Sequence, residues 1–597
     1  MRVPQGARFH FDGFVGGRMK ANQENWLLQA PLSNPAILQI FRGRDRKPRP
    51  KLLPWAGEFA GKYLISAVSG YRLARGKRLR CFLEKFVRDL TAVQDADGYL
   101  GPHPQGERLI GKTHDSKGAL WDLWGHYHCM LGLFLWWQET GDNSALSAAC
   151  KAGDLICNRF LDTGERAINA GAEEMNLAVS HVLCLLYEVT GNKRYLRMVH
   201  EIERDWETPP AGDYVHTALS GLEFFQTPKP RWESLHDVQA IAELFFITGD
   251  ERYRKAVTHI WRSIRHYDRH NTGAFSSAEQ AVGNPYDLRA IETCCVIAWI
   301  ALSIDVLRMT GDSTVADEIE LATFNAVFGA QHPSGRWWTY NTPMEGVRRA
   351  SSHDIVFQAY QGAPELNCCA VNGPRGIGMI SEWAFMFTDD GVTVNFYGPC
   401  TIQLSLARDL ILTLTQTTYY PRDGEIAIKL LLTKPCEFAL RLRIPTWSRM
   451  TKASVNRRDI KDVNAGSYLI INREWENGDT IKLAFDMSLH IWVGKREKTN
   501  RISIYRGPIL LAYDQRFNTM DPDDIPPIDA RNLSYVTSEC SRHQAAWLLL
   551  RFHCPDGRDL LLCDFATAGA TGTQYCTWLP ICSVEELLPE TLSPLVQ

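Results

Sequence analysis

The sequence predicts a multidomain protein of mixed α and β structure, in which a helical N-terminal part precedes antiparallel β-sandwich modules. The first observation is a glycine terminator that recurs after aromatic-rich helical runs, at Gly141, Gly191, Gly249 and Gly311. The second is a change of pattern near residue 385, after which apolar and polar residues alternate in short stretches separated by turn residues. Helical spacing predicts amphipathic helices and alternation predicts half-buried strands, so the two halves belong to different structural classes.

The N-terminal stretch, residues 1–20, has a pattern of its own. It contains Phe9, Phe11 and Phe14 among several glycines, and we expect a short strand or an extended arm that packs on the β modules. From about residue 24 the apolar residues recur at three- and four-residue spacing. We therefore assign residues 21–387 to a helical domain.

The four glycine terminators lie 50, 58 and 62 residues apart, an interval that fits a helix pair plus a loop. Degenerate repeats of helix pairs are typical of a closed α/α toroid or of a solenoid. Long irregular segments between the pairs, residues 205–231 and 264–288, are expected to gather at one mouth of such a structure and to carry function.

The C-terminal part has the pattern of antiparallel β structure, most simply a sandwich. Residues 426–430 and 438–445 show clear alternation. We place a first β-sandwich at residues 388–518. A stretch rich in Pro and Asp, residues 520–527, separates it from a C-terminal β segment or second sandwich at residues 519–597.

Composition excludes several classes of partner. The 597-residue chain has a formal net charge of −3 and no block of one sign, so nucleic acid and anionic membrane surfaces are poor partners. We find neither an uncharged apolar run of about 18 residues nor a signal-peptide pattern after Met1, and we expect a cytoplasmic protein without a membrane span. The 16 cysteines then suit metal binding or catalysis better than disulfides. The 18 Trp and 20 Tyr suit either sugar-binding platforms or large helical cores.

Two vicinal cysteine pairs carry the clearest chemical signal. Cys294 and Cys295 follow Glu292 closely, and Cys368 and Cys369 lie about 75 residues further on. Adjacent side chains cannot share one face of a helix or strand, which makes ordinary core packing a poor explanation for both pairs.

The segment after the second pair predicts a helix start. Asn372–Arg375 forms a turn pattern that places Pro374 at the first helical position. Cys368 and Cys369 would then lie just before a helix N-terminus, where the helix dipole favours the thiolate over the thiol.

Three thiolates and one carboxylate make a tetrahedral zinc site, and Zn²⁺ is the cofactor that we predict. Glu292 and Cys294 are two residues apart, so they converge on one point only outside regular helix geometry. The spacing is not that of a zinc ribbon. The alternative is that the cysteines are buried, reduced core residues.

Motifs along nearly the whole chain support one family resemblance. They are Gly98-Tyr99-Leu100, Trp121–His128, Glu292-Thr293-Cys294 and Cys368-Cys369 in the helical half, and Leu442–Trp447, Arg473-Glu474-Trp475 and Tyr505–Pro508 in the β half. In this order they resemble glycoside hydrolase family 127, the β-L-arabinofuranosidase-like family. The resemblance implies an (α/α)6 barrel followed by β-sandwich modules.

The resemblance also implies a catalytic site. The zinc ligands would be Glu292, Cys294, Cys368 and Cys369. Cys368 would be the nucleophile of a retaining mechanism and Glu292 its acid/base, because two ligands of one metal are held close enough for both roles. Cys295 is a spare thiol that we expect to pack in the core.

Further polar residues fall where the family has substrate contacts: Glu279, His236, Tyr340 and either His128 or His126. Each of them, taken alone, also fits a capping, core or surface role. Asn176 stands where better-known members carry another substrate histidine, and we count it as a substrate-binding candidate. This departure leaves open a substrate other than β-L-arabinofuranose.

The leading prediction is a retaining exo-glycosidase for β-L-arabinofuranosides or a related plant cell-wall sugar, with an oligosaccharide or a small glycoside as substrate. One alternative keeps the scaffold but changes the specificity to a branched or acidic sugar. Another is a non-catalytic carbohydrate-binding protein whose zinc is structural and needed for folding. We predict no nucleic-acid or membrane partner and leave a homodimer open.

Overall fold

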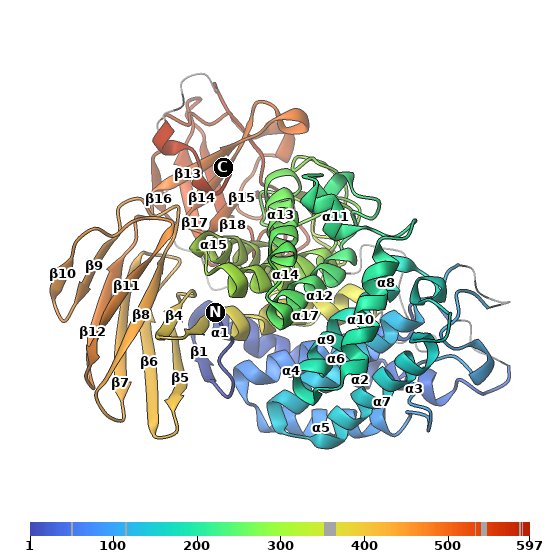
Figure 1. Ribbon diagram of the computed structural model, residues 1–597. Coiled ribbons are helices and arrows are strands. Elements are labelled where there is room, and N and C mark those ends of the chain that lie inside the picture. Colours follow the sequence, from blue (N-terminus) through green and yellow to red (C-terminus); the bar gives the residue numbers. More distant parts are fainter. Residues whose placement is uncertain are drawn as a thin grey trace.

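The computed structural model describes residues 1–48, 52–113, 116, 118–350, 366–531, 533–538, 546–583, 587 and 589–596. It confirms the predicted order of a helical part followed by antiparallel sheets (Figure 1). The α-helices are α1 Gly13–Asn22, α2 Ala30–Ser33, α3 Ala36–Arg42, α4 Glu58–Ala74, α5 Lys77–Thr91, α6 Asp122–Thr140, α7 Asn143–Phe160, α8 Glu173–Asn176, α9 Val179–Thr190, α10 Lys193–Trp206, α11 Tyr214–Leu219, α12 Ser234–Thr248, α13 Glu251–Tyr267, α14 Thr293–Thr310, α15 Ser313–Leu321, α16 Phe328–Ala330, α17 Cys368–Gly378 and α18 Ile380–Trp383.

Each of the four predicted terminators ends one helix and leads directly into the next. Gly141 adopts the left-handed conformation (φ 75°) after α6, and its N–H donates to the Trp137 carbonyl. The Asp142 side chain then accepts from the Ser144 N–H at the start of α7. The arrangement recurs between α9 and α10, α12 and α13, and α14 and α15, with the capping residues Asn192, Asp250 and Asp312. These junctions produce the predicted helix pairs, while the closed barrel stays a prediction.

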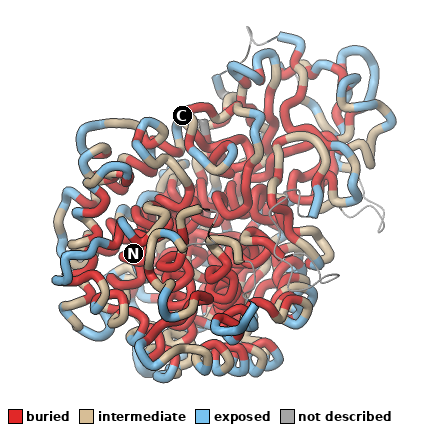
Figure 2. Tube along the Cα trace, turned by 90° about the vertical axis from the view of Figure 1, so that its right-hand side faces the viewer, coloured by how far each residue is buried: buried red, intermediate tan, exposed pale blue. Residues whose placement is uncertain are grey.

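Helix α14 lies in the core of the helical part. By length and composition alone it meets the criteria for a membrane-crossing helix, but 83% of its 18-residue window is buried inside the protein. Nearby, α4 packs against α6 and α17. Gly61 permits this close approach, because a Cβ there would lie 2.2 Å from the His128 carbonyl carbon. Figure 2 shows the buried segments filling the interior, with exposed segments around the rim.

The strands are β1 Arg8–Phe11, β2 Glu345–Val347, β3 Phe385–Thr388, β4 Gly391–Val394, β5 Cys400–Ala407, β6 Leu410–Thr418, β7 Glu425–Leu432, β8 Cys436–Ile444, β9 Lys452–Val455, β10 Arg458–Ile460, β11 Ser467–Trp475, β12 Thr480–Ala484, β13 Leu489–Val493, β14 Arg501–Arg506, β15 Ile509–Asp514, β16 Tyr535–Thr537, β17 Leu549–His553, β18 Asp559–Asp564, β19 Gln574–Cys576 and β20 Leu579–Pro580. One sheet has the order β1-β5-β6-β7-β12-β9-β10 and a second the order β11-β8-β4-β3. The third sheet contains β13-β14-β15-β18-β17-β16, with β19, β2 and β20 alongside. Among the strands named above, the pairing is antiparallel apart from β4 with β8, which run parallel.

The N-terminal arm is extended only in part. Arg8–Phe11 forms β1 and pairs with β5, so this segment does pack on the β part as we expected. The prediction of an extended conformation up to residue 20 was wrong, because α1 begins at Gly13. Gly13 has a φ of 62°, a conformation that glycine adopts without strain, and it turns the chain from the strand into the helix.

The predicted boundary between residues 518 and 519 was wrong, because the third sheet spans it. β15 lies before this point and pairs with β18, which lies after it. The stretch rich in Pro and Asp is therefore a connection within one sheet and not a linker. In addition, β2 from the helical part pairs with β19, which attaches this sheet to the helical part.

Candidate active site and metal centre

Two helices begin at the same point in the interior. Helix α14 starts after Glu292, whose extended backbone (φ −75°, ψ 139°) makes it the N-cap residue. Helix α17 starts at Cys368 after Asn367, whose side chain accepts from the Ala370 N–H at 2.9 Å. Glu292 and Cys294 therefore converge outside regular helix geometry, and both helix dipoles favour negative charge at this point.

The register of α17 differs from the prediction. Pro374 lies inside the helix, and Cys368 and Cys369 are its first two residues. Pro374 cannot donate a backbone hydrogen bond to the Ala370 carbonyl. The Trp26 indole N–H donates to that carbonyl instead, at 2.7 Å. Both thiols therefore lie at a helix N-terminus, as we expected, although Pro374 is not the first helical residue.

The structure brings the four predicted ligands together: the ligand atoms of Glu292, Cys294, Cys368 and Cys369 all lie within 4.8 Å of one another. Cys369 Sγ lies 3.3 Å from Glu292 Oε1 and 3.5 Å from Cys294 Sγ. Cys368 Sγ lies 3.7 Å from the same carboxylate oxygen. Ligands of a tetrahedral zinc ion are separated by about 3.3–3.8 Å, so the donor set and its spacing fit zinc.

Cys295 lies outside this donor set. It is buried, and its Sγ lies 3.9 Å from Glu292 Oε2, on the opposite carboxylate oxygen from the ligand cysteines. Burial raises the pKa of Cys295 well above its usual value. The expectation that this thiol packs in the core agrees with its position.

The pKa values of Cys368 and Glu292 are shifted in opposite directions. Hydrogen bonds from the Cys294 and Cys369 thiols and the positive charge of Lys62 lower the pKa of Cys368 well below its usual value. Burial raises the pKa of Glu292 well above its usual value, and negative charge on Cys368 adds to this effect. A bound cation would release protons from the donor set, because metal ligands bind in their deprotonated form.

Cys368 and Glu292 also line a cavity of about 170 Å³. The other lining residues are Trp55, Glu58, Lys62, Trp121, Arg231, Trp232, Glu233, Glu279 and Tyr340. Aromatic faces together with a few converging polar groups are typical of a small-ligand site. The Tyr340 hydroxyl lies 3.8 Å from Cys368 Sγ, so this predicted residue reaches the reactive thiol.

The two long loops meet at this cavity. Arg231 of the first loop pairs with Gln280 of the second, and the Trp232 N–H donates to the Glu279 carbonyl at 3.3 Å. The Arg231 guanidinium also donates to the Glu279 side chain at 2.9 Å. Glu279 has a φ of 70°, which is strained for a residue other than glycine and is often found at functional sites. These contacts bring the two loops together as predicted and place Glu279 at the cavity, while its contact with substrate stays a prediction.

Two of the predicted histidines lie behind the cavity wall. His236, near the start of α12, has its Nδ1 3.1 Å from the Tyr127 hydroxyl. His128 packs edge-on against the Trp124 ring, with 4.4 Å between the ring centroids. Neither ring nitrogen of His128 has a hydrogen-bond partner within the described part of the chain. Substrate contact by His128 and His236 stays a prediction.

His126 and Asn176 have structural roles. His126 Nε2 accepts from the Leu100 N–H at 3.0 Å. The Asn176 side chain accepts from the Trp124 N–H at 3.1 Å and donates to two backbone carbonyls. Neither residue lines the cavity, and substrate contact by His126 and Asn176 stays a prediction. Their side chains hold backbone segments together.

Comparison with known proteins decides the family. The family model described as the catalytic domain of beta-L-arabinofuranosidase, GH127, matches residues 28–382. The model of the GH127 middle domain matches residues 391–487. The chain belongs to glycoside hydrolase family 127. The middle-domain match ends just before β13, in agreement with the observed start of the third sheet.

Solved structures of family 127 share the fold. The structure titled as the GH127 beta-arabinofuranosidase BT3674 has 21% sequence identity and a TM-score of 0.80, over 97% of each chain. The GH127 beta-L-arabinofuranosidase from Geobacillus stearothermophilus T6 has 19% identity and a TM-score of 0.77, over 97% of this chain and 100% of that one. A third structure, titled as a glycoside hydrolase, has 19% identity and a TM-score of 0.75, over 98% of each. No curated protein sequence matches the chain.

Much of the cavity wall of this family 127 chain was missed from the sequence. Glu58 and Lys62 come from α4, Trp121 immediately precedes α6, and Trp232 and Glu233 immediately precede α12. Glu58 and Lys62 left a local signal, because opposite charges one helical turn apart occur in a run that is otherwise mostly apolar. Trp121 appeared in the sequence only as the first residue of a family motif.

Proposed function

We propose that this family 127 chain is a retaining glycosidase that hydrolyses β-L-arabinofuranosides or a related sugar. The position of Cys368 carries the proposal, because this residue belongs to the donor cluster and also lines the cavity. Cys294 and Cys369 are buried, whereas Cys368 is half-buried. A metal site that served the fold alone would gain nothing from presenting one thiol to a cavity. The names of the family model and of the solved relatives support the choice of sugar.

In the proposed reaction the Cys368 thiolate attacks the anomeric carbon, and the bond from that carbon to the leaving oxygen breaks. A carboxyl group in the cavity donates a proton to the leaving oxygen. The same group then takes a proton from water, whose oxygen attacks the anomeric carbon, breaks the carbon–sulfur bond and restores the thiolate. Two displacements at one carbon retain its configuration.

Glu292, Cys294, Cys368 and Cys369 would hold the zinc ion that we propose as cofactor. When bound, such an ion keeps its cysteine ligands deprotonated and fixed in place. The protein supplies further support for negative charge at Cys368. The residue is at the N-terminus of α17, and the Tyr340 hydroxyl is placed to donate to its sulfur.

Two carboxyl groups in the cavity are available to carry the proton. Glu292 is the residue assigned from the sequence, but its Oε1 faces Cys369 and its Oε2 faces Cys295. A carboxylate that binds a metal is not free to carry a proton to a leaving group. Glu279 also lines the cavity, stands outside the donor set and has a side chain that is 30% exposed. The geometry therefore favours Glu279 as the acid/base, with Glu292 as the alternative.

Hydrolysis of an aryl β-L-arabinofuranoside tests the proposal. We expect turnover by the unchanged protein, with the product released in the same anomeric form, and a loss on the order of 10⁴-fold in kcat for Cys368→Ser. Cys295→Ser is the matched control, because Cys295 contacts Glu292 from outside the donor set, and we expect it to keep activity. A protein that binds the arabinoside and one metal ion but hydrolyses no aryl glycoside would favour the non-catalytic alternative.

A further inference from the structure

We propose that Glu58 and Lys62 form the part of the cavity that recognises the sugar, and that they select an uncharged sugar with neighbouring hydroxyl groups over a uronic acid. This inference rests on the proposed glycosidase function and names its substrate class. Both residues lie on α4, one turn apart, and both line the cavity onto which Cys368 opens.

The carboxylate of this pair is buried but incompletely hydrogen-bonded. Lys62 Nζ lies 2.9 Å from Glu58 Oε2, and both side chains are 1% exposed. The Trp124 indole N–H also donates to Oε2. Glu58 Oε1 has no hydrogen-bond partner within the residues that the structure describes. An unsatisfied buried oxygen is unfavourable, and at a cavity wall a ligand hydroxyl is the group that would satisfy it.

Lys62 complements this carboxylate. Its ammonium group carries three N–H donors, more than the contact with Glu58 uses. The rings of Trp124 and Trp232 lie 5.3 and 5.2 Å from Nζ and stabilise its charge. Sugar hydroxyls both donate and accept. Two neighbouring hydroxyls therefore match the pair, one donating to Glu58 Oε1 and the other accepting from Lys62.

The charge of the cavity wall argues against an acidic sugar. The second cation, Arg231, donates at 2.9 Å to both Glu233 and Glu279. Among the described residues that line the cavity there are thus four glutamates and two cations, and each cation is already bound to a glutamate. The carboxylate of a uronic acid would meet like charge without a free counter-charge, which selects against it.

A substrate series tests the recognition by Glu58. Glu58→Gln is compared with the unchanged protein on the neutral aryl glycoside that is hydrolysed fastest and on its monodeoxy analogues. We expect Glu58→Gln to lower kcat/KM about 10- to 100-fold on the parent glycoside. On one deoxy analogue the effect should shrink to about twofold or less, because that analogue lacks the hydroxyl bound by Oε1. A purely structural role for Glu58 would lower kcat/KM equally across the series.

Two further variants control for folding. Glu84→Gln is the matched control, because Glu84 forms an ion pair of the same one-turn spacing with Arg80, 3.0 Å away, on the exposed face of α5. We expect it to leave all rates unchanged. Breaking a buried pair can unfold a protein, so Glu58→Gln/Lys62→Met, which removes both charges, is measured alongside. With an unchanged metal content and a cooperative thermal transition, this double variant should lose the same discrimination among the deoxy analogues.

The second part of the experiment uses the same glycoside with its primary alcohol carbon oxidised to a carboxylate. We expect the unchanged protein to prefer the neutral form by about 100-fold or more, and Glu58→Gln to narrow this preference about tenfold, because Lys62 is then free to bind the carboxylate. Equal hydrolysis of both forms by the unchanged protein, or an equal effect of Glu58→Gln on every deoxy analogue, would overturn this inference and leave the proposed function standing. No hydrolysis of any glycoside would overturn both.

Discussion

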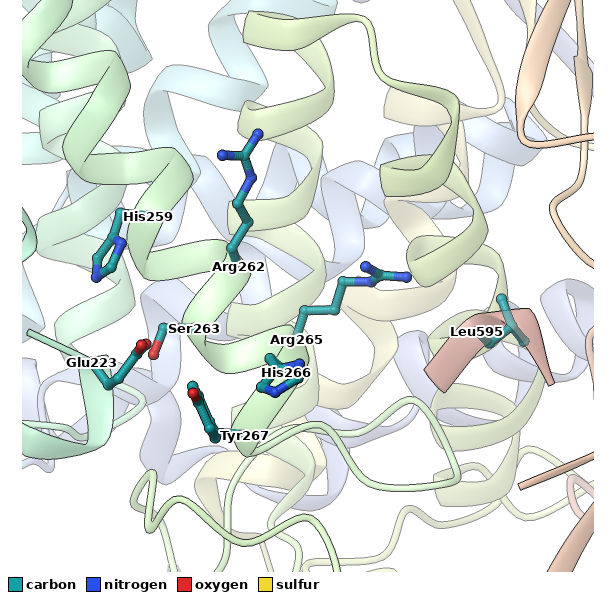
Figure 3. A pocket seen from close by; sticks show the side chains of 8 residues that line it. All are labelled: Glu223, His259, Arg262, Ser263, Arg265, His266, Tyr267 and Leu595. Carbon is teal, nitrogen blue, oxygen red and sulfur yellow. The ribbon is translucent and has the colours of Figure 1, made fainter. Parts of the chain in front are cut away.

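A cavity and a groove in the helical part show that volume alone does not identify the candidate active site. The cavity at Cys368 has a volume of about 170 Å³. The other hollow, of about 300 Å³, lies beside α13 and is lined by Glu223, His259, Arg262, Ser263, Arg265, His266, Tyr267 and Leu595 (Figure 3). The groove beside α13 is the larger of the two and also contains titratable side chains, so volume alone would favour it.

The cavity differs from the groove in that several of its charged side chains are buried and converge on one space. In the groove, His259 Nε2 lies 2.9 Å from the Leu222 carbonyl and Arg265 pairs with Glu318, and Figure 3 shows Arg262 and Arg265 pointing away from Glu223. In the cavity, Glu58, Glu233 and Glu292 are each at most 2% exposed. Burying charge is costly, and buried charges that converge on one space are characteristic of sites that carry out chemistry.

Metal removal should produce the largest contrast between the two hollows. We expect a chelator to abolish hydrolysis and to lower the thermal midpoint, because the four donors, three of them buried, would lose the cation that binds them together. Cys369→Ala should reproduce both effects and Cys295→Ala neither, as measured by metal content, activity and calorimetry. Full activity in protein shown to contain no metal would contradict this expectation.

Substitution of Glu279 or Glu292 should give the next largest effect, a loss of kcat. We expect Glu279→Gln to lower kcat about 10²- to 10⁴-fold on a substrate with a poor leaving group and much less on a dinitrophenyl glycoside, which needs no proton. Glu292→Gln should lower both rates together and reduce metal content. If the leaving-group dependence appears in Glu292→Gln instead, the original assignment of Glu292 as acid/base is the right one.

Aromatic residues at the cavity should have a moderate effect. The rings of Trp55 and Trp121 are 5.2 Å apart and half-buried, and we expect them to stack against a sugar or an aryl leaving group. Trp55→Ala should raise KM about 3- to 10-fold and leave kcat nearly unchanged. Trp137→Ala, at the far end of α6, is the control and should leave both constants unchanged. Unchanged KM in Trp55→Ala would exclude this contact.

The buried carboxyl groups of the cavity should also make the free energy of unfolding depend on pH. Burial raises the pKa of Glu233 to about 7, although Arg231 opposes the shift. A raised carboxyl pKa means that the folded state binds the proton more tightly, so this contribution is complete below about pH 4.5 and is lost as the pH rises through about 7. Between pH 5 and pH 8 the free energy of unfolding should therefore fall by about 1–3 kcal/mol less in Glu233→Gln than in the unchanged protein, as measured by denaturation at both pH values. If the free energy of unfolding changed equally with pH in Glu233→Gln and in the unchanged protein, the raised pKa of Glu233 would be contradicted.

Substitutions in the groove beside α13 should have the smallest effect. We expect Arg262→Ala and His266→Ala to change kcat/KM by about twofold at most, because neither side chain lines the cavity at Cys368 and exposed side chains of this kind contribute little to stability. A loss comparable to that of Glu58→Gln would show that burial and convergence are not the right criteria for choosing between the two hollows.

Short-range patterns were sufficient for the helix pairs. Gly141 and Asp142 act through hydrogen bonds to Trp137 and Ser144, only a few residues away in the chain, so the residue types at these positions determine the local structure. The start of α17 could not be predicted in the same way. The side chain that takes the carbonyl freed by Pro374 belongs to Trp26, 344 residues from Ala370 in the chain.

The sequence alone determined the class of each half of the protein and the four residues of the candidate metal centre, because these depend on residue types at short spacing and on motifs in a fixed order. Only the tertiary structure decided that Glu58 and Lys62 line the same cavity as Cys368, since the packing of α4 against α17 joins segments about 300 residues apart. It also decided that His126 and Asn176 serve the scaffold. Burial and convergence control the chemistry of a charged side chain, and both arise from long-range packing that no local pattern contains.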